Sequence, residues 1–138
     1  MRIFKNKSFL RFARKQEISD ADLCAAVRNA DRGLIDADLG GGVIKQRIAR
    51  RGEGKSGGFR TLILFRIHDR AFFVHGYAKN ESDNIRPDEL TALKKLAASM
   101  LAYQDGELQR VLASGTLMEI DCDGQSETIS QRSDGVDS

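Results

Sequence analysis

The sequence has few of the residues that build covalent or metal sites: two cysteines, two histidines, one proline and no tryptophan in 138 residues. Cys24 and Cys122 are far apart in unlike surroundings, which argues against a disulfide framework or a cysteine metal site. We expect Cys24 to be a small core residue and Cys122 an exposed free thiol. His68 and His75 show no metal-ligand pattern, so we expect a turn residue and a satisfied strand residue, with no metal or other cofactor.

Long apolar runs are also missing. Runs such as Leu62–Phe65 and Ala71–Val74 cover four residues each, which is too short to cross a membrane. The first residues, MRIFKNKSFLRF, interleave basic and apolar side chains, so no signal peptide is expected. A cytoplasmic protein with no membrane partner is the default expectation.

Charge is unevenly distributed along the chain, although the net charge is only +2. Residues 121–138 hold five acids and one base, a net charge of −4, so residues 1–120 carry +6. We expect residues 122–138 to be a disordered acidic tail, because this segment has almost no apolar residue. Residues 1–121 are expected to form one domain, since that length can bury a core.

Helical signals occur at both ends of the predicted domain. Apolar residues recur at helical spacing in Ser8–Lys15 and again after Ser19, which forms a capping-box pattern with Asp22. Pro87, followed by two acids, opens a longer helix. Together with the strands below, these signals predict an α+β fold with two N-terminal helices and a longer C-terminal helix.

Strand signals fill the middle of the sequence. Period-two alternation predicts strands at 43–50, 59–67 and 71–77, and their short connections predict an antiparallel meander. Arg2–Phe4 is expected to add a short edge strand. Leu34–Gly42, with three glycines, is expected to be a loop.

The connection between the first two predicted strands carries the densest positive charge. From Lys45 to Arg60 there are six basic residues and one acid, Glu53, a local net charge of +5. A basic hairpin with glycines at its tip suits a polyanion, of which nucleic acid is the commonest. GKS at 54–56 is no P-loop, because Ala49 stands where that motif needs glycine and a strand follows.

The candidate site combines basic, phenolic and amide side chains. RNA carries its own nucleophile, the 2′-hydroxyl, so an enzyme needs to orient it, take its proton and neutralise charge at the phosphate. Arg and Lys neutralise charge, and a crowded Lys or a Tyr moves protons. The predicted catalytic residues are Arg60, Lys55, Lys79 and Tyr77. The predicted RNA-binding residues are Lys45, Arg47, Arg50, Arg51, Asn80 and Asn84. The alternative is a basic face that only binds.

With these residues in view, the chain resembles the RelE/ParE superfamily, the toxins of type II toxin–antitoxin systems. The runs that carry the resemblance are DLGGGVIKQRIAR at 38–50, GKSGGFR at 54–60 and YAKNESDNI at 77–85, and it covers residues 1–120. It implies a compact fold of two N-terminal helices, an antiparallel sheet and a further helix. It also implies a cognate antitoxin, and cleavage of messenger RNA on the ribosome without metal, through a 2′,3′-cyclic phosphate.

The resemblance assigns roles residue by residue. Arg60, in the Phe59–Arg60 pair, takes the phosphate-binding role, and Lys55 and Lys79 match basic residues of the superfamily. Arg86 stands where the best-known nucleases of the superfamily place a catalytic tyrosine, so the general base stays open. Some members inhibit DNA gyrase and cleave nothing, which makes gyrase inhibition the rival function, ahead of a plain RNA-binding module.

Overall fold

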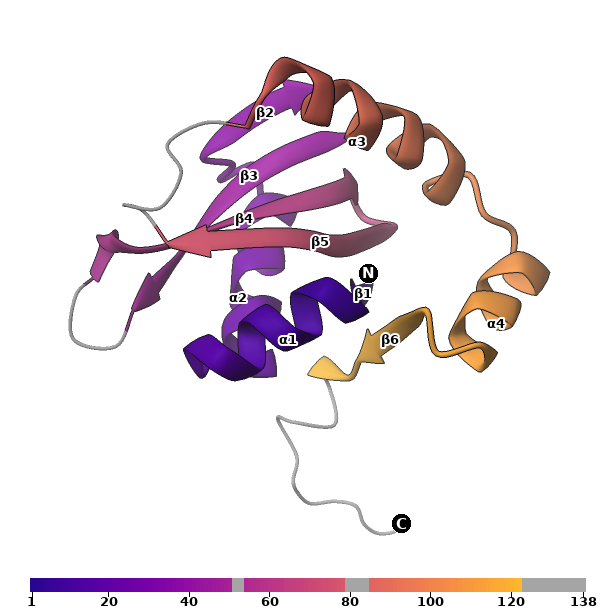
Figure 1. The fold of residues 1–138 in the computed structure, drawn as a ribbon, viewed down its shortest axis with the longest axis horizontal. Coiled ribbons are helices and arrows are strands. Elements are labelled where there is room, and N and C mark those ends of the chain that lie inside the picture. The colour runs from indigo at the N-terminus through magenta and orange to yellow at the C-terminus, as the bar shows by residue number, and fades with distance from the viewer. Residues whose placement is uncertain (51–53, 79–84, 123–138) are drawn as a thin grey trace, which may run out of the picture.

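The computed structural model describes the backbone of residues 1–50, 54–78 and 85–122, and all of their side chains except those of 50 and 54–57. These residues form one sheet with helices on both faces (Figure 1). The elements in chain order are β1 (Arg2–Asn6), α1 (Lys7–Gln16), α2 (Asp20–Asp31), β2 (Ala37–Gly40), β3 (Val43–Arg50), β4 (Gly54–Arg66), β5 (Arg70–Ala78), α3 (Pro87–Met100), α4 (Asp105–Ala113) and β6 (Leu117–Ile120). The predicted α+β class, with its two N-terminal helices and longer C-terminal helix, is confirmed.

The centre of the sheet is the predicted antiparallel meander of β3, β4 and β5. The full strand order is β2-β3-β4-β5-β1-β6, and β1 runs parallel to β5. The prediction of an edge strand at Arg2–Phe4 is wrong, because β1 lies between β5 and β6. Ile3 and Phe4 are buried on opposite faces of the sheet, and a strand covered on both faces belongs in its interior.

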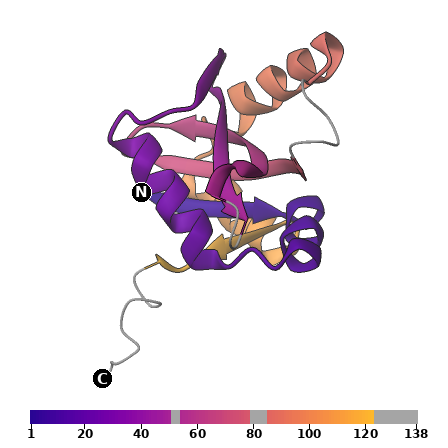
Figure 2. The same cartoon turned by 90° about the vertical axis from the view of Figure 1, so that its left-hand side faces the viewer.

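Two apolar cores fill the spaces between the sheet and its helices. On one face, α1 and α2 pack on strand residues that include Phe59, Ile63 and Phe73. On the other, α3 and α4 pack on Leu62 and Leu64. Figure 2 shows α3 at the top of the molecule and α1 and α2 at the bottom. The alternation predicted for β4 is thus confirmed, and each face of the strand serves a separate core.

The glycine-rich stretch before β3 is a hairpin turn, and the prediction of a loop there is only partly right. Within it, Ala37–Gly40 form strand β2, which pairs with β3. Gly42 has φ +84°, and a Cβ on it would lie 2.7 Å from Leu101 Cδ1. Glycine therefore lets this turn adopt a left-handed backbone and pack closely against the end of α3.

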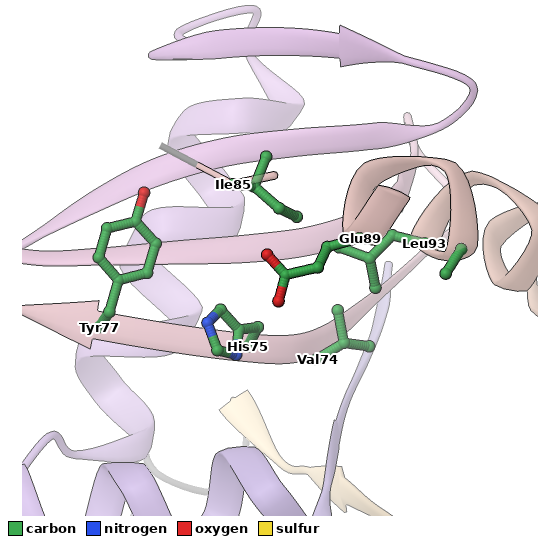
Figure 3. Close-up of a pocket in the computed structure, with 7 residues that line it drawn as sticks. Val74, His75, Tyr77, Ile85, Glu89 and Leu93 are labelled. Carbon is green, nitrogen blue, oxygen red and sulfur yellow. The ribbon is translucent and has the colours of Figure 1, made fainter. Parts of the chain in front are cut away.

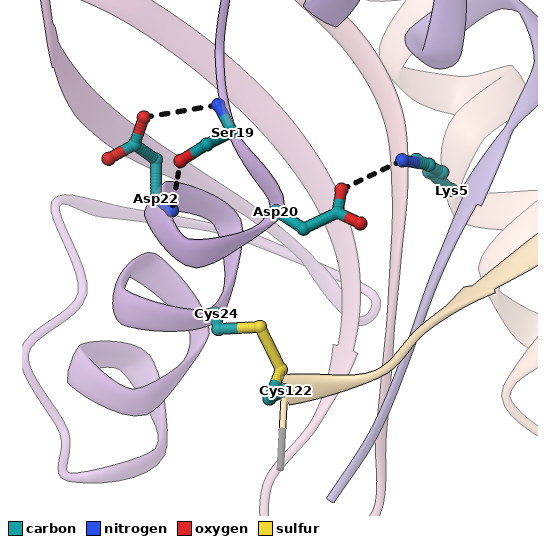
Figure 4. The surroundings of a disulfide bond; sticks show 6 residues. All are labelled: Lys5, Ser19, Asp20, Asp22, Cys24 and Cys122. Carbon is teal, nitrogen blue, oxygen red and sulfur yellow. Dashed lines mark hydrogen bonds and ion pairs between the residues drawn. A yellow bond between two sulfur atoms is a disulfide. The ribbon is translucent and has the colours of Figure 1, made fainter. Parts of the chain in front are cut away.

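The prediction that Cys122 is an exposed free thiol is wrong. Cys24 and Cys122 form a disulfide whose Cα atoms are 5.9 Å apart, and it ties α2 to the end of β6 (Figure 4). Pairing of β6 with β1 carries the chain past α2, a contact that sequence spacing does not reveal. Cys122 packs against the α1–α2 core, so the fold extends to this residue, and the predicted tail from 123 on lies outside the described residues.

The predicted start signals of the helices are present. Ser19 Oγ accepts a hydrogen bond from Asp22 N at 3.1 Å, and Asp22 Oδ2 accepts one from Ser19 N at 3.2 Å. Pro87 is the first residue of α3, and Glu89 Oε1 accepts a hydrogen bond from Arg86 N at 3.1 Å. Over the described part of the chain, no helix has the length and apolar character needed to span a membrane.

Candidate functional site

One face of the sheet, the face that also carries α3, becomes polar toward the C-terminal ends of β3 and β5 and in the first half of β4. Arg47 pairs with Arg60 across β3 and β4, and Arg60 pairs with Tyr77 across β4 and β5. The next row, one pleat along, holds Lys45, Leu62 and His75. Side chains two residues apart on a strand share a face, so Arg60 continues the row of Leu62 and Leu64.

A β-bulge in β5 brings His75 onto this same face. Leu62 pairs with His75 while Ile63 pairs with Phe73, so Val74 is an extra residue on β5. Before the bulge, Phe73 faces α1; after it, His75 and Tyr77 line a cavity beside α3 together with Val74. Bulges re-aim side chains in this way next to functional sites.

Gly76, two residues after the bulged Val74, explains how the strand accommodates α1. A Cβ on Gly76 would lie 2.4 Å from Phe12 Cε2, so only glycine leaves room for the Phe12 ring. Phe12 in turn packs edge-on against Phe59, with ring centroids 5.7 Å apart. The close approach of α1 at Gly76 thus fixes which face of β5 is presented to α1 and which to α3.

Arg60 is the central side chain of the polar row. It is half-buried, and its Nη1 atom is fully buried with no hydrogen-bond partner in the structure's described portion. Buried polar groups are nearly always paired, and an exception calls for a functional explanation. The residue as a whole is partly exposed, and a guanidinium can bind an anion such as phosphate in a fork.

Arg47 is exposed and also has a protein partner. Its Nη2 lies 3.2 Å from Asp36 Oδ1, and its backbone N–H donates to Asp36 Oδ2 at 2.7 Å. Asp36 N in turn donates to Gln46 Oε1 at 2.7 Å, so the carboxylate is firmly placed. Asp36 offsets the positive charge of Arg47, which reduces the repulsion between Arg47 and Arg60 across β3 and β4. Of these two arginines, Arg60 is therefore the better placed anion ligand.

A cavity of about 330 Å³ opens beside Tyr77, between β5 and the first turns of α3. Its lining includes Val74, His75 and Tyr77 from the strand and Glu89 and Leu93 from the helix. Figure 3 shows the Glu89 carboxylate reaching from α3 toward His75 and Tyr77. The cavity therefore joins a carboxylate, an imidazole and a phenol beside the Arg60 row.

The structure places some of the predicted site residues together and leaves others untested. Arg60 and Tyr77 are neighbours across β4 and β5, and Lys45 and Arg47 share their face through alternation in β3. The remaining predicted residues lie outside the described residues or have side chains that are not described: Arg50, Arg51, Lys55, Lys79, Asn80 and Asn84.

Two residues of the cavity were not predicted as site residues. His75 was expected to be a satisfied strand histidine, yet it is exposed and lines the cavity. Glu89 was interpreted only as a helix-start residue. Gly76 was the available signal for His75, because glycine inside a strand pattern indicates a bulge or a close backbone approach. No local signal relates Glu89 to β5.

A family model described as the RelE toxin of the RelE/RelB toxin–antitoxin system matches residues 1–120. The matched span begins before β1 and ends with the last residue of β6. No curated protein sequence matches the chain.

Proposed function

The chain belongs to the RelE toxin family of toxin–antitoxin systems, and on that premise we propose that it is a ribosome-dependent messenger-RNA endonuclease. In this reaction the 2′-hydroxyl of one nucleotide attacks the adjacent phosphate. The bond to the 5′-oxygen of the next nucleotide breaks, which leaves a 2′,3′-cyclic phosphate and a 5′-hydroxyl. The protein's task is to align the reacting oxygens, move two protons and stabilise the negative charge that develops on the phosphate.

The observation that supports this proposal is the environment of Arg60. Its buried Nη1 lacks a hydrogen-bond partner among the described residues, and it sits in a polar row between Arg47 and Tyr77. Hydrogen-bond donors that the fold already holds in position stabilise developing charge most effectively. We therefore assign the transition-state contact with the phosphate to Arg60.

The other predicted residues take supporting roles in the proposal. Tyr77, next to Arg60, and the lysines Lys55 and Lys79 are the proposed proton-transfer and charge-neutralising groups. The proposed RNA-backbone ligands are Lys45, Arg47, Arg50, Arg51, Asn80 and Asn84. Lys45 is half-buried on the same face as Arg60, which suits a contact close to the site.

A toxin of this family has an antitoxin as partner. We propose that the antitoxin lays an acidic segment over the basic stretch from Lys45 to Arg60, whose net charge of +5 is its electrostatic complement. The antitoxin and RNA then compete for the same surface. Reversing the charge at Arg51 should slow antitoxin association at low salt if this is so.

The test of the cleavage proposal compares Arg60→Ala with Arg66→Ala. Both residues lie on β4, an even number of positions apart and so on the same face of the strand. Arg66, however, is exposed near the hairpin turn and pairs with Asp69. Arg60→Ala should lower cleavage by about 100-fold or more and relieve growth arrest, because a transition-state contact is lost. Arg66→Ala should retain both.

The readout is the mapping of RNA ends after induction, with melting temperatures to show that both variants fold. New 5′ ends within translated codons that vanish in Arg60→Ala support the proposal. DNA breaks with intact transcripts would instead indicate gyrase inhibition. Full cleavage by a folded Arg60→Ala protein would remove Arg60 from the site.

A further inference from the structure

We propose that the cavity between β5 and α3 binds one unstacked nucleobase that bears an exocyclic amino group. The inference deepens the proposed function, because the base would belong to the RNA whose phosphate Arg60 binds. It makes Glu89 a specificity-determining residue, and it favours cytosine, adenine or guanine over uracil.

The size of the cavity suits a single heterocycle. Its volume of about 330 Å³ lies at the lower end of the range for small-molecule sites, roughly 300–1,000 Å³. Apolar side chains, Val74, Ile85 and Leu93, form part of its lining, and polar groups are few. A mostly apolar hollow with a few directed polar groups is the usual form of a site for a planar ligand.

Two rings of β5 form one side of the cavity. The His75 and Tyr77 ring centroids lie 5.8 Å apart with planes inclined by 40°. Unstacked RNA bases stack on His and Tyr side chains, and each such stack contributes roughly 1–3 kcal/mol by alanine substitution. The bulge at Val74 brings both rings onto the face that carries α3, so the cavity depends on this backbone irregularity.

Glu89 supplies the directional contact. Its Oε1 accepts the hydrogen bond of Arg86 N, which fixes the carboxylate at the start of α3, while the group points toward His75 and Tyr77 (Figure 3). An ionised carboxylate only accepts hydrogen bonds. It pairs with the amino group of cytosine, adenine or guanine, whereas uracil offers only its N3–H, flanked by two carbonyl oxygens that repel the carboxylate.

The cavity lies within one nucleotide of the proposed phosphate site. Tyr77 pairs directly with Arg60, and His75 pairs with Leu62, the next residue on the same face of β4. Arg60 and His75 are therefore diagonal neighbours, a relation that places Cα atoms about 7–8 Å apart in a sheet. A phosphate on Arg60 and the base of the same nucleotide in the cavity are thus compatible.

The test is a nuclear magnetic resonance titration of the full chain with cytidine, adenosine, guanosine and uridine 5′-monophosphates. The chain has only two histidines, His68 and His75, and His68 lies in the turn between β4 and β5. The His75→Gln variant assigns their ring signals, and His68 serves as the internal control. We expect the three amino-bearing nucleotides to shift the His75 signal and leave that of His68 in place.

Uridine monophosphate should bind about tenfold more weakly, as expected for one lost hydrogen bond to a charged group. Glu89→Gln should abolish this preference, because the amide both donates and accepts, and can still cap Arg86 N. The matched control is Asp88→Asn, which removes the same charge from the neighbouring residue; Asp88 is exposed, pairs with Arg86 and is absent from the cavity lining. It should keep the preference.

The outcomes separate this inference from the cleavage proposal. Equal binding of all four nucleotides, no shift of His75, or an unchanged preference in Glu89→Gln would overturn the nucleobase pocket, whether or not transcripts are cut. A His75 shift caused by the antitoxin alone, with none from nucleotides, would assign the cavity to the partner protein and would also overturn it. Selective nucleotide binding without transcript cleavage would uphold the pocket and leave the nuclease proposal to fail by itself.

Discussion

Single side chains connect elements that the backbone alone does not hold together, and Asp31 is an example. It lies at the end of α2, and its Oδ1 accepts a hydrogen bond from His68 N at 2.6 Å in the turn between β4 and β5. Its Oδ2 lies 3.1 Å from His68 Nδ1. Burial raises the pKa of Asp31, but the hydrogen bonds and charge attraction from His68 more than offset it, so the pKa is lowered overall.

This lowered pKa gives a prediction for acid stability. Because the folded chain favours the ionised carboxylate, the contribution of Asp31 is fully present above its unfolded pKa, about 3.9, and is lost as pH falls through the lower folded value. Asp31→Asn should cost about 1 kcal/mol at pH 7. Urea denaturation of both proteins between pH 7 and pH 3 should show the difference in unfolding free energy shrinking at the acid end. A difference that is constant or grows would contradict the assignment.

Gln46 shows how a buried polar side chain sets the position of a site residue. Its Nε2 donates hydrogen bonds to the carbonyl oxygens of Ala26 and Leu34, each at 3.1 Å, and its Oε1 accepts a hydrogen bond from Asp36 N. Asp36 then binds Arg47. The position of Asp36, and with it the ion pair of Arg47, therefore depends on contacts that begin in α2. The net charge of the hairpin, counted from the sequence, is larger than the charge left for RNA once this ion pair has formed.

At the scale of elements, the fit between α1 and β5 decides the shape of the candidate site. Phe12 on α1 occupies the space above Gly76, and the bulge at Val74 lies two residues before that contact. The helix thereby covers one face of the strand and leaves His75 and Tyr77 to the other. A regular β5 would place His75 on the same face as Phe73, away from α3.

Gly76→Ala tests this fit. The new Cβ would meet the Phe12 ring at 2.4 Å, so we expect a loss of about 1–3 kcal/mol from overpacking. Gly106→Ala in α4 is the matched control, because the nearest atom to its Cβ is the Arg110 Nη1 at 3.8 Å and alanine favours helix.

The double variant with Phe12→Ala shows whether the ring is the cause. Its loss of unfolding free energy should be smaller than the sum of the two single losses, because the alanine at 76 then occupies space that the ring has left. Additive losses in urea denaturation would show that Gly76 matters for its backbone and not for its contact with Phe12.

At the scale of the whole molecule, the disulfide joins the two ends of the described chain. Cys24 lies on α2, and Cys122 lies two residues after β6, the strand that completes the sheet, with a sequence separation of 98 residues. A nearby ion pair between Lys5 Nζ and Asp20 Oδ1, at 2.8 Å, connects β1 with α2 in the same region (Figure 4). The sheet's last strands and α2 therefore support each other.

Reduction of the disulfide should lower stability considerably. A crosslink that closes a loop of this length restricts the unfolded chain by about 4–5 kcal/mol in the loop-entropy model. We expect the oxidised protein to melt at a clearly higher temperature than the dithiothreitol-treated protein, while Cys122→Ser melts at the lower temperature with or without the reductant. Identical melting curves for the oxidised and reduced wild-type protein would show that the crosslink adds nothing.

The sequence by itself determined the elements whose cause is local. Period-two alternation predicted the meander of β3, β4 and β5 and the two faces of β4 from Phe59 on, because side chains of a strand alternate whatever packs on them. The Ser19–Asp22 box and Pro87 marked the starts of α2 and α3, because caps act within four residues. The quoted runs also indicated the family that the match to residues 1–120 shows.

Only the tertiary structure decided the contacts between distant segments. The place of β1 inside the sheet, the Cys24–Cys122 disulfide and the pairing of Arg47 with Asp36 all depend on how separate elements pack. The cavity lined by His75 and Glu89 arises in the same way, from a bulge in β5 and the position at which α3 packs on the sheet. Periodicity carries no information about such contacts, because each is set by the shape of the partner element and not by the residues beside it in the chain.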